Sequence, residues 1–203
     1  EYETTIKQKL SVEECLASVD ECPAPIVSIC GGEPMIYPEI GRLVREILKK
    51  RKHIYLCTNG MFTRKKLAEF RPTSSFFWNV HLDGMEKSHD LAVEREGVFA
   101  EAIEGIKAAK AAGFLVCTNT TIYKETDMHE IAVLLAYLTE LGVAHDIKVY
   151  PGAGHSILNR HEGWQGALAR VPSPMRVGYR DADAEDGWRR MLAFFDEHVA
   201  AAP

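Results

Sequence analysis

Along the first 150 residues, the spacing of apolar positions alternates between two periods, and this alternation predicts the secondary structure. Continuous apolar runs, which are typical of buried strands, occur at 26–30, 53–57, 76–82, 114–121 and 147–150. Between these runs, apolar residues recur every three or four positions, as on one face of a helix. The predicted helices lie near 12–19, 40–48, 63–69, 97–112 and 131–141. Strands that alternate with helices favour an α/β fold with a parallel sheet of about five strands.

The pattern breaks after Pro151. Residues 152–182 contain many glycine, proline, arginine and serine residues and show no clear period. The chain then returns to a helical period, with apolar residues at 188, 191, 192, 195 and 199. We therefore expect two parts: an α/β domain at residues 1–150, and a loop followed by a C-terminal helix at residues 151–203.

Glycines and polar residues follow three successive predicted strands. Gly31, Gly32 and Glu33 follow the first strand, Asn59 the second and Asp83 the third. The carboxyl ends of parallel strands meet at one edge of a sheet, where α/β folds bind their ligands. Glycine lets the backbone approach a ligand closely, and carboxylates and amides supply hydrogen bonds. We expect one shared ligand site at this edge, although Asn-Gly and Asp-Gly are also ordinary turn sequences.

Composition narrows the class of protein. The 203 residues carry a net charge of −5 without a basic stripe, which argues against nucleic acid as a partner. No apolar run is long enough to span a bilayer and the first residues lack a signal-peptide pattern, so we expect a cytoplasmic protein. We interpret Cys30, Cys57 and Cys117, which fall in strand-like runs, as reduced thiols packed in the core. His81 and His89 lack a recognised metal-ligand spacing, so no metal site is expected.

The order of the strand-end motifs resembles a known family. Gly-Gly-Glu-Pro at 31–34, Thr-Asn-Gly at 58–60 and Leu-Asp-Gly at 82–84 resemble the radical S-adenosylmethionine superfamily. Longer stretches at 10–15, 27–34, 55–59 and 80–84 resemble its hopanoid-biosynthesis branch, the adenosylhopane-forming enzymes of bacteria. The resemblance covers about residues 1–142 and implies a partial (β/α) barrel.

The resemblance also implies a cofactor, a substrate and site residues. Members bind S-adenosylmethionine on a 4Fe-4S cluster, which cysteines in a C-x3-C-x2-C loop hold. The hopanoid branch implies addition of a 5′-deoxyadenosyl group to the alkene of a lipid-like triterpene. By motif match, Glu33 binds the cationic amino group of S-adenosylmethionine beside Gly31 and Gly32. The ribose hydroxyls and the carboxylate are then contacted by Asn59, Asp83 and Asn119.

One part of the family pattern is absent from this sequence. The cysteines stand at 15, 22, 30, 57 and 117, which is too far apart for the C-x3-C-x2-C loop. We therefore expect a truncated member that lacks the first strand and the cluster loop of the barrel. Loss of the first strand leaves an exposed sheet edge, so self-association is also expected.

The C-terminal part resembles a different family. Residues 143–156 and 184–196 resemble the end of the dienelactone hydrolase family, whose triad histidine matches His155. The nucleophile elbow G-x-C-x-G of that family is approximated only by Ser28-Ile29-Cys30-Gly31-Gly32. One alternative is therefore a hydrolase that uses His155 with Cys30 on an ester or lactone. A non-catalytic α/β domain is another.

Overall fold

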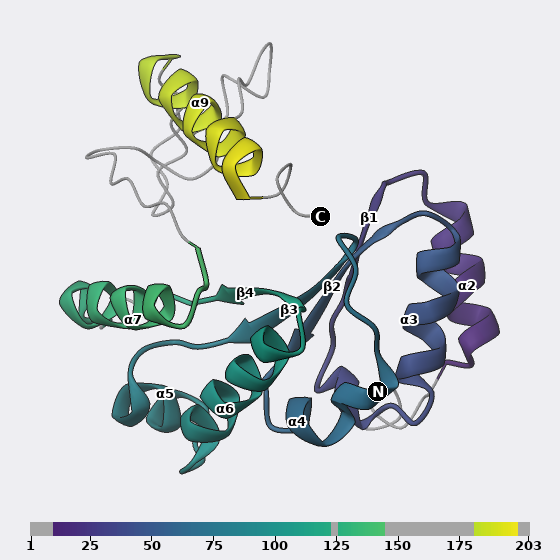
Figure 1. Cartoon of the computed structure of the whole chain (residues 1–203), viewed down its shortest axis with the longest axis horizontal. Helices are drawn as coiled ribbons and strands as arrows, with labels where there is room; N and C mark the ends of the chain where they lie inside the picture. The colour runs from purple at the N-terminus through teal and green to yellow at the C-terminus, as the bar shows by residue number, and fades with distance from the viewer. Residues whose placement is uncertain (1–9, 123–125, 145–180, 199–203) are drawn as a thin grey trace, which may run out of the picture. The chain divides into compact units, whose positions relative to one another are not determined.

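The computed structural model describes residues 10–122, 126–144 and 181–198 of the chain (Figure 1). The chain divides into two compact units, Glu1–Ala144 and His145–Pro203. The first unit contains a sheet with its helices, and the second contains helix α9 (Asp181–His198). The predicted strand at 147–150 and the candidate residue His155 lie outside the described residues.

Four parallel strands form the sheet of the first unit. They lie side by side in chain order as β1 (Ile26–Ile29), β2 (His53–Thr58), β3 (Phe76–His81) and β4 (Leu115–Asn119). Each strand lies at an apolar run that predicted it. An α/β fold with a parallel sheet and a C-terminal helix is therefore confirmed.

Helices precede and connect the strands. Helix α2 (Val12–Glu21) begins with a capping box, a pattern that Ser11 and Glu14 already show in the sequence, and each of the two side chains bonds the other's backbone N–H. The connections contain α3 (Ile40–Lys49), α4 (Thr63–Lys66), α5 (Glu86–Ala92) and α6 (Val98–Ala111), and α7 (Met128–Glu140) follows β4. Helix α5 was not predicted, because its seven residues are too few to show a helical period.

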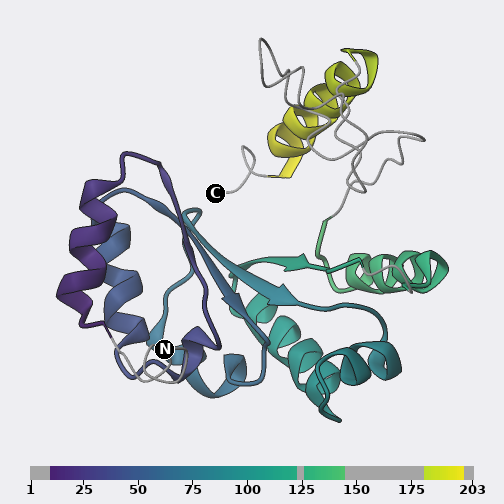
Figure 2. The same ribbon diagram turned by 180° about the vertical axis from the view of Figure 1, so that it is seen from behind.

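Helices α3 and α6 cover one face of the sheet. Every second side chain of β2 and β3 lies on this helix-covered face, and Ile54, Leu56, Phe76 and Trp78 are 0% exposed there. The rings of Phe70, Phe76, Trp78 and Phe114 form edge-to-face and stacked pairs in this core. Helix α2 packs on α3, and α5 packs on α6 (Figure 2). None of the described helices is long and apolar enough to cross a membrane.

The alternate side chains of the same strands form the second face of the sheet. This second face consists of Ile26, Ser28, His53, Tyr55, Cys57, Phe77, Asn79, His81, Leu115, Cys117 and Asn119, which are partly or fully exposed. The expectation that the strand cysteines pack in the core is therefore wrong. Cys57 and Cys117 lie on the second face and Cys30 is exposed, because continuous apolar runs do not reveal which face a residue occupies.

Candidate functional site

The carboxylate of Glu33 joins the ends of β1 and β2. Glu33 is the N-cap of a short 3-10 helix, η1 (Pro34–Ile36), and its Oε1 accepts hydrogen bonds from Met35 N at 2.9 Å and Thr58 Oγ1 at 2.8 Å. Its Oε2 accepts one from Asn59 N at 2.8 Å. A carboxylate offers about four acceptor positions, so these three bonds leave roughly one position for a ligand.

The two glycines before Glu33 border open space. Gly31 has φ +128°, which side chains other than glycine rarely adopt, and a Cβ at either Gly31 or Gly32 would meet nothing within 4 Å. Gly60, after β2, is different, because a Cβ there would lie 2.7 Å from the Cα of Ala102 in α6. Gly60 is therefore needed for packing, whereas Gly31 and Gly32 leave room for a ligand at the strand end.

Asn59 forms the turn that its sequence context suggested. Its Oδ1 accepts a hydrogen bond from Met61 N at 3.1 Å, which is the geometry of an Asx turn. Asn119, at the end of β4, is exposed, and its backbone oxygen accepts from Leu82 N at 3.0 Å. Both side chains lie at the same edge of the sheet as Glu33.

Asp83 joins the ends of β3 and β4. Its side chain is 2% exposed, and its Oδ1 accepts hydrogen bonds from His81 Nε2 at 2.6 Å and Thr121 N at 2.8 Å. The backbone N–H of Asp83 donates to His89 Nδ1 at 3.1 Å. Asp83 thus fixes the ends of β3 and β4, as Glu33 fixes the ends of β1 and β2 at the same edge of the sheet.

Two histidines whose spacing fits no recognised metal site belong to this arrangement. His81 is 31% exposed on the second face, whereas His89 is 0% exposed. Since Asp83 accepts at Oδ1, His81 Nε2 is the donor, and a neutral ring keeps Nδ1 as an acceptor. Burial lowers the pKa of His89, and nearby His81 lowers it further, so His89 is neutral at pH 7. Side chains two residues apart in a strand point to the same face, so the spacing of His81 and Asp83 in the sequence could have predicted that they lie close together.

Below these strand ends, the described residues of the second face include an apolar row and no aspartate, glutamate, lysine or arginine. Tyr55, Phe77 and Leu115 lie in register across β2, β3 and β4, and the first two rings stack with centroids 4.9 Å apart. In the next row, Asn79 Nδ2 donates to Cys57 Sγ at 3.3 Å. Burial, and secondarily Cys57, raises the pKa of Cys117 to about 12, so Cys117 stays a thiol.

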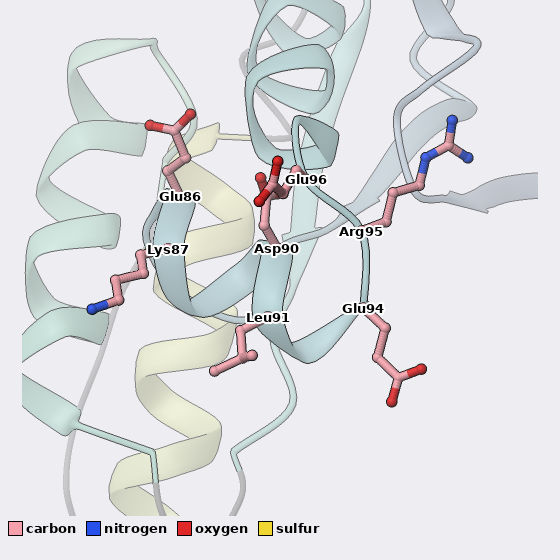
Figure 3. A pocket seen from close by; sticks show the side chains of 7 residues that line it. All are labelled: Glu86, Lys87, Asp90, Leu91, Glu94, Arg95 and Glu96. Carbon is pink, nitrogen blue, oxygen red and sulfur yellow. The ribbon is translucent and has the colours of Figure 1, made fainter.

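Two cavities lie near α5. The first, of about 490 Å³, is lined by Asp83 together with Ser88, Leu91, Ala92, Thr126, Asp127 and Glu130. The second, of about 600 Å³, lies along α5 and the turn that follows it, and Figure 3 shows its charged side chains pointing in different directions. Its Asp90 accepts hydrogen bonds from the backbone N–H groups of Gly97 and Phe99, so this carboxylate fixes the start of α6.

The described residues do not fit a 4Fe-4S cluster. They contain no group of three His, Cys, Asp or Glu side chains able to hold a metal ion. All five cysteines are free, and Cys57 and Cys117 are separated by the whole width of β3.

Comparisons with known proteins relate the first unit to one family. The family model described as "Radical SAM superfamily" matches residues 2–138, more than half of the 203 residues. A GTP 3',8-cyclase of Mycobacterium ulcerans is 30% identical over 119 residues, which are 57% of this chain and 33% of that protein. A GTP 3',8-cyclase of Campylobacter fetus is 28% identical over 138 residues, 66% of this chain and 43% of that protein. The chain therefore spans less than half the length of these curated relatives.

Two further matches concern the fold and the C-terminal part. The crystal structure of Streptococcus suis SuiB has a TM-score of 0.58 and 15% identity, and the match covers 94% of this chain and 42% of that one. At this identity the likeness concerns the fold alone. The family model described as "Dienelactone hydrolase family" matches residues 103–199.

Proposed function

This chain belongs to the radical SAM superfamily, and from that membership we propose that the carboxyl edge of its sheet binds S-adenosylmethionine. The open space beside Gly31 and Gly32 carries the proposal. The two glycines precede a carboxylate that η1 and the end of β2 hold in place, so an accessible backbone lies beside a fixed acceptor. A bound cofactor of this kind gains affinity when its contacts are ordered beforehand.

In this proposal each strand end has a separate role. Glu33 offers its remaining acceptor position to the cationic amino group, beside the backbone of Gly31 and Gly32. Asn59 and Asn119 face the ribose and carboxylate groups. Asp83 is almost fully buried, so it acts by holding His81, whose Nδ1 accepts a hydrogen bond from a ribose hydroxyl.

When bound to a reduced 4Fe-4S cluster, S-adenosylmethionine supplies the 5′-deoxyadenosyl group that the superfamily transfers or uses as a radical. The described residues of this chain offer no ligands for that cluster. We therefore assign to them the binding and orientation of S-adenosylmethionine, and no radical step.

For the substrate of the parent reaction, we propose a hopanoid alkene rather than GTP. GTP appears in the names of the curated relatives, and a triphosphate is bound by cationic side chains or backbone N–H groups. Among the described residues of the second face there is no lysine or arginine. The stacked Tyr55 and Phe77, with Leu115 beside them, favour an uncharged ligand with a large apolar body.

The cofactor proposal is tested by equilibrium dialysis of S-adenosylmethionine against the purified chain. We expect saturable binding that Gly32→Leu abolishes, since a Cβ there meets no protein atom within 4 Å and the leucine side chain extends into the open space. Ala100→Leu, at an exposed position of α6, is the matched control and should bind as the wild type does. No binding by the wild type, or equal binding by Gly32→Leu, would contradict the proposal.

The substrate proposal is tested by NMR titration of the isotope-labelled chain with a triterpene alkene in mixed micelles and, separately, with GTP, followed at the ring signals of Tyr55. We expect the triterpene to perturb Tyr55, and Phe77→Asp to remove the effect because it places a charge in the apolar row. A GTP response that exceeds the triterpene response would reverse the assignment.

A hydrolase remains the second candidate function, because the dienelactone hydrolase family model matches residues 103–199. Its candidate base, His155, lies outside the described residues, and its candidate nucleophile, Cys30, is exposed at the end of β1. Turnover of a p-nitrophenyl ester that His155→Ala and Cys30→Ala each abolish would favour this function. Turnover that survives both changes would remove it.

A further inference from the structure

We propose that Glu130 is a positioning residue for this edge of the sheet: it fixes the turn after β3 and, through that turn, Asp83 and His81. The role rests on the proposed binding of S-adenosylmethionine. Glu130 lies in the first turn of α7, far along the chain from the turn that it holds. Neither the motifs of the sequence nor the family matches point to it.

Both carboxylate oxygens of Glu130 bind the start of α5. Oε1 accepts a hydrogen bond from the backbone N–H of Met85 at 3.0 Å, and Oε2 accepts one from Ser88 Oγ at 2.7 Å. Met85 is the N-cap of α5, and no side chain of its own caps that helix. A charged acceptor from α7 therefore satisfies a backbone donor that the helix start leaves open.

The same spacing of cap and acid gives a different result in α2. There Glu14, three residues after the N-cap Ser11, returns its carboxylate to the backbone N–H of Ser11. Glu130 stands three residues after the N-cap Asp127, yet it reaches the β3–α5 turn instead. Glu130 thus uses both of its carboxylate oxygens on the start of α5 and not on the start of its own helix.

The turn fits closely against Glu130. A Cβ at Gly84 would lie 3.0 Å from Ser88 Cβ and 3.3 Å from Glu130 Oε1, so a larger residue there would press on both. Gly84 directly follows Asp83, whose Oδ1 holds His81 and Thr121. A shift of this turn would move Asp83 and thereby loosen the ends of both β3 and β4.

A cation site in the 490 Å³ cavity is the competing interpretation, since Asp83, Asp127 and Glu130 all line it. Each of these carboxylates already accepts a hydrogen bond from a backbone N–H of the protein, from Thr121, His129 and Met85 respectively. Among the residues that the structure describes, no metal-binding group is found. The geometry therefore favours a structural clamp over an ion site.

Amide hydrogen exchange measured by NMR tests the clamp, with S-adenosylmethionine binding measured on the same variants. In Glu130→Ala we expect the Met85 amide to exchange roughly tenfold faster or more, because a charge-assisted bond is lost. S-Adenosylmethionine should bind about three- to tenfold more weakly, since fewer molecules hold the competent turn. Glu130→Gln keeps an acceptor for Met85 N and a partner for Ser88, and should restore most of both quantities. Glu140→Ala, exposed at the other end of α7, is the matched control.

Each outcome decides the proposal. Unchanged Met85 exchange in Glu130→Ala would overturn it, and faster exchange with unchanged affinity would reduce Glu130 to a structural role and also overturn it. If the wild type binds no S-adenosylmethionine, the proposed function fails on its own, and the Met85 exchange still decides whether Glu130 holds the turn.

Discussion

Trp78 and Phe77 are neighbours in β3, yet their side chains have opposite surroundings. Trp78 is 0% exposed on the helix-covered face and contacts Phe70, Phe76 and Phe114. Phe77 is half-buried on the second face, where it stacks on Tyr55. Toward the strand ends, this face carries polar groups. The helix-covered face thus contributes mainly to stability, whereas the second face and its carboxyl edge hold the groups that suit a ligand.

Two acidic residues stabilise the carboxyl edge of the sheet, one in each half. Glu33 holds the ends of β1 and β2, and Asp83 holds the ends of β3 and β4. Glu33 uses three of its roughly four acceptor positions on the protein, and Asp83 is almost fully buried, so the remaining position of Glu33, the glycine backbone and His81 are left to contact a ligand. Acids in a binding motif can therefore act by fixing the contact groups.

The largest expected effect is a difference in the free energy of unfolding between substitutions on the two faces. Trp78→Ala removes a fully buried ring and should lower the free energy of unfolding by about 3–5 kcal/mol. Phe77→Ala should cost less than half as much, because its ring is only partly removed from water. Urea denaturation of both variants measures the difference, and equal losses would show that the second face is also a core.

The next effect compares two glycines of the edge. Gly60→Ala forces a Cβ to within 2.7 Å of the α6 backbone at φ +82°, and should destabilise the fold by about 2–4 kcal/mol. Gly32→Ala meets no atom within 4 Å and should change stability by less than about 0.5 kcal/mol. Thermal unfolding provides the comparison. A large loss in Gly32→Ala would mean that Gly32 serves the fold.

A smaller effect concerns the Glu33 clamp. Glu33→Ala leaves Asn59 N and Thr58 Oγ1 without their acceptor and should cost about 1–3 kcal/mol. Glu33→Gln keeps one acceptor oxygen and should lose roughly half of that. Urea denaturation checks both values, and a neutral Glu33→Ala would show that the clamp does not hold the strand ends.

The smallest effect is a dependence on pH. The pKa of folded His89 lies below its unfolded value of about 6.5, so the unfolded chain binds the proton more tightly. This contribution to stability is complete above pH 6.5 and is lost as pH falls, by up to about 1.4 kcal/mol per pH unit until the folded pKa is reached. His89→Leu should remove this slope between pH 7 and 5. An unchanged slope would assign the acid sensitivity to other groups.

Much of the fold could be predicted because its signals are local. Apolar runs marked all four described strands, and the capping box of Ser11 and Glu14 marked the start of α2. Which face Cys57 and Cys117 occupy could not be read, since the apolar residues of these runs continue on both faces of the strands although only one face is covered. The contacts of His81 with Asp83 and of Glu130 with Met85 depend on tertiary geometry. The candidate site was thus predicted as a set of strand ends, without the bonds that connect them.

The most direct test of the account is an NMR titration of the isotope-labelled chain with S-adenosylmethionine. The account predicts saturable shifts in the amides of Gly31, Gly32 and Asn119 and in the imidazole of His81. Ile106 and Leu43, on the helices of the covered face, should keep their shifts. Saturable shifts confined to the helix-covered side, or no shifts at all, would contradict the assignment of the ligand site to the carboxyl edge of the sheet.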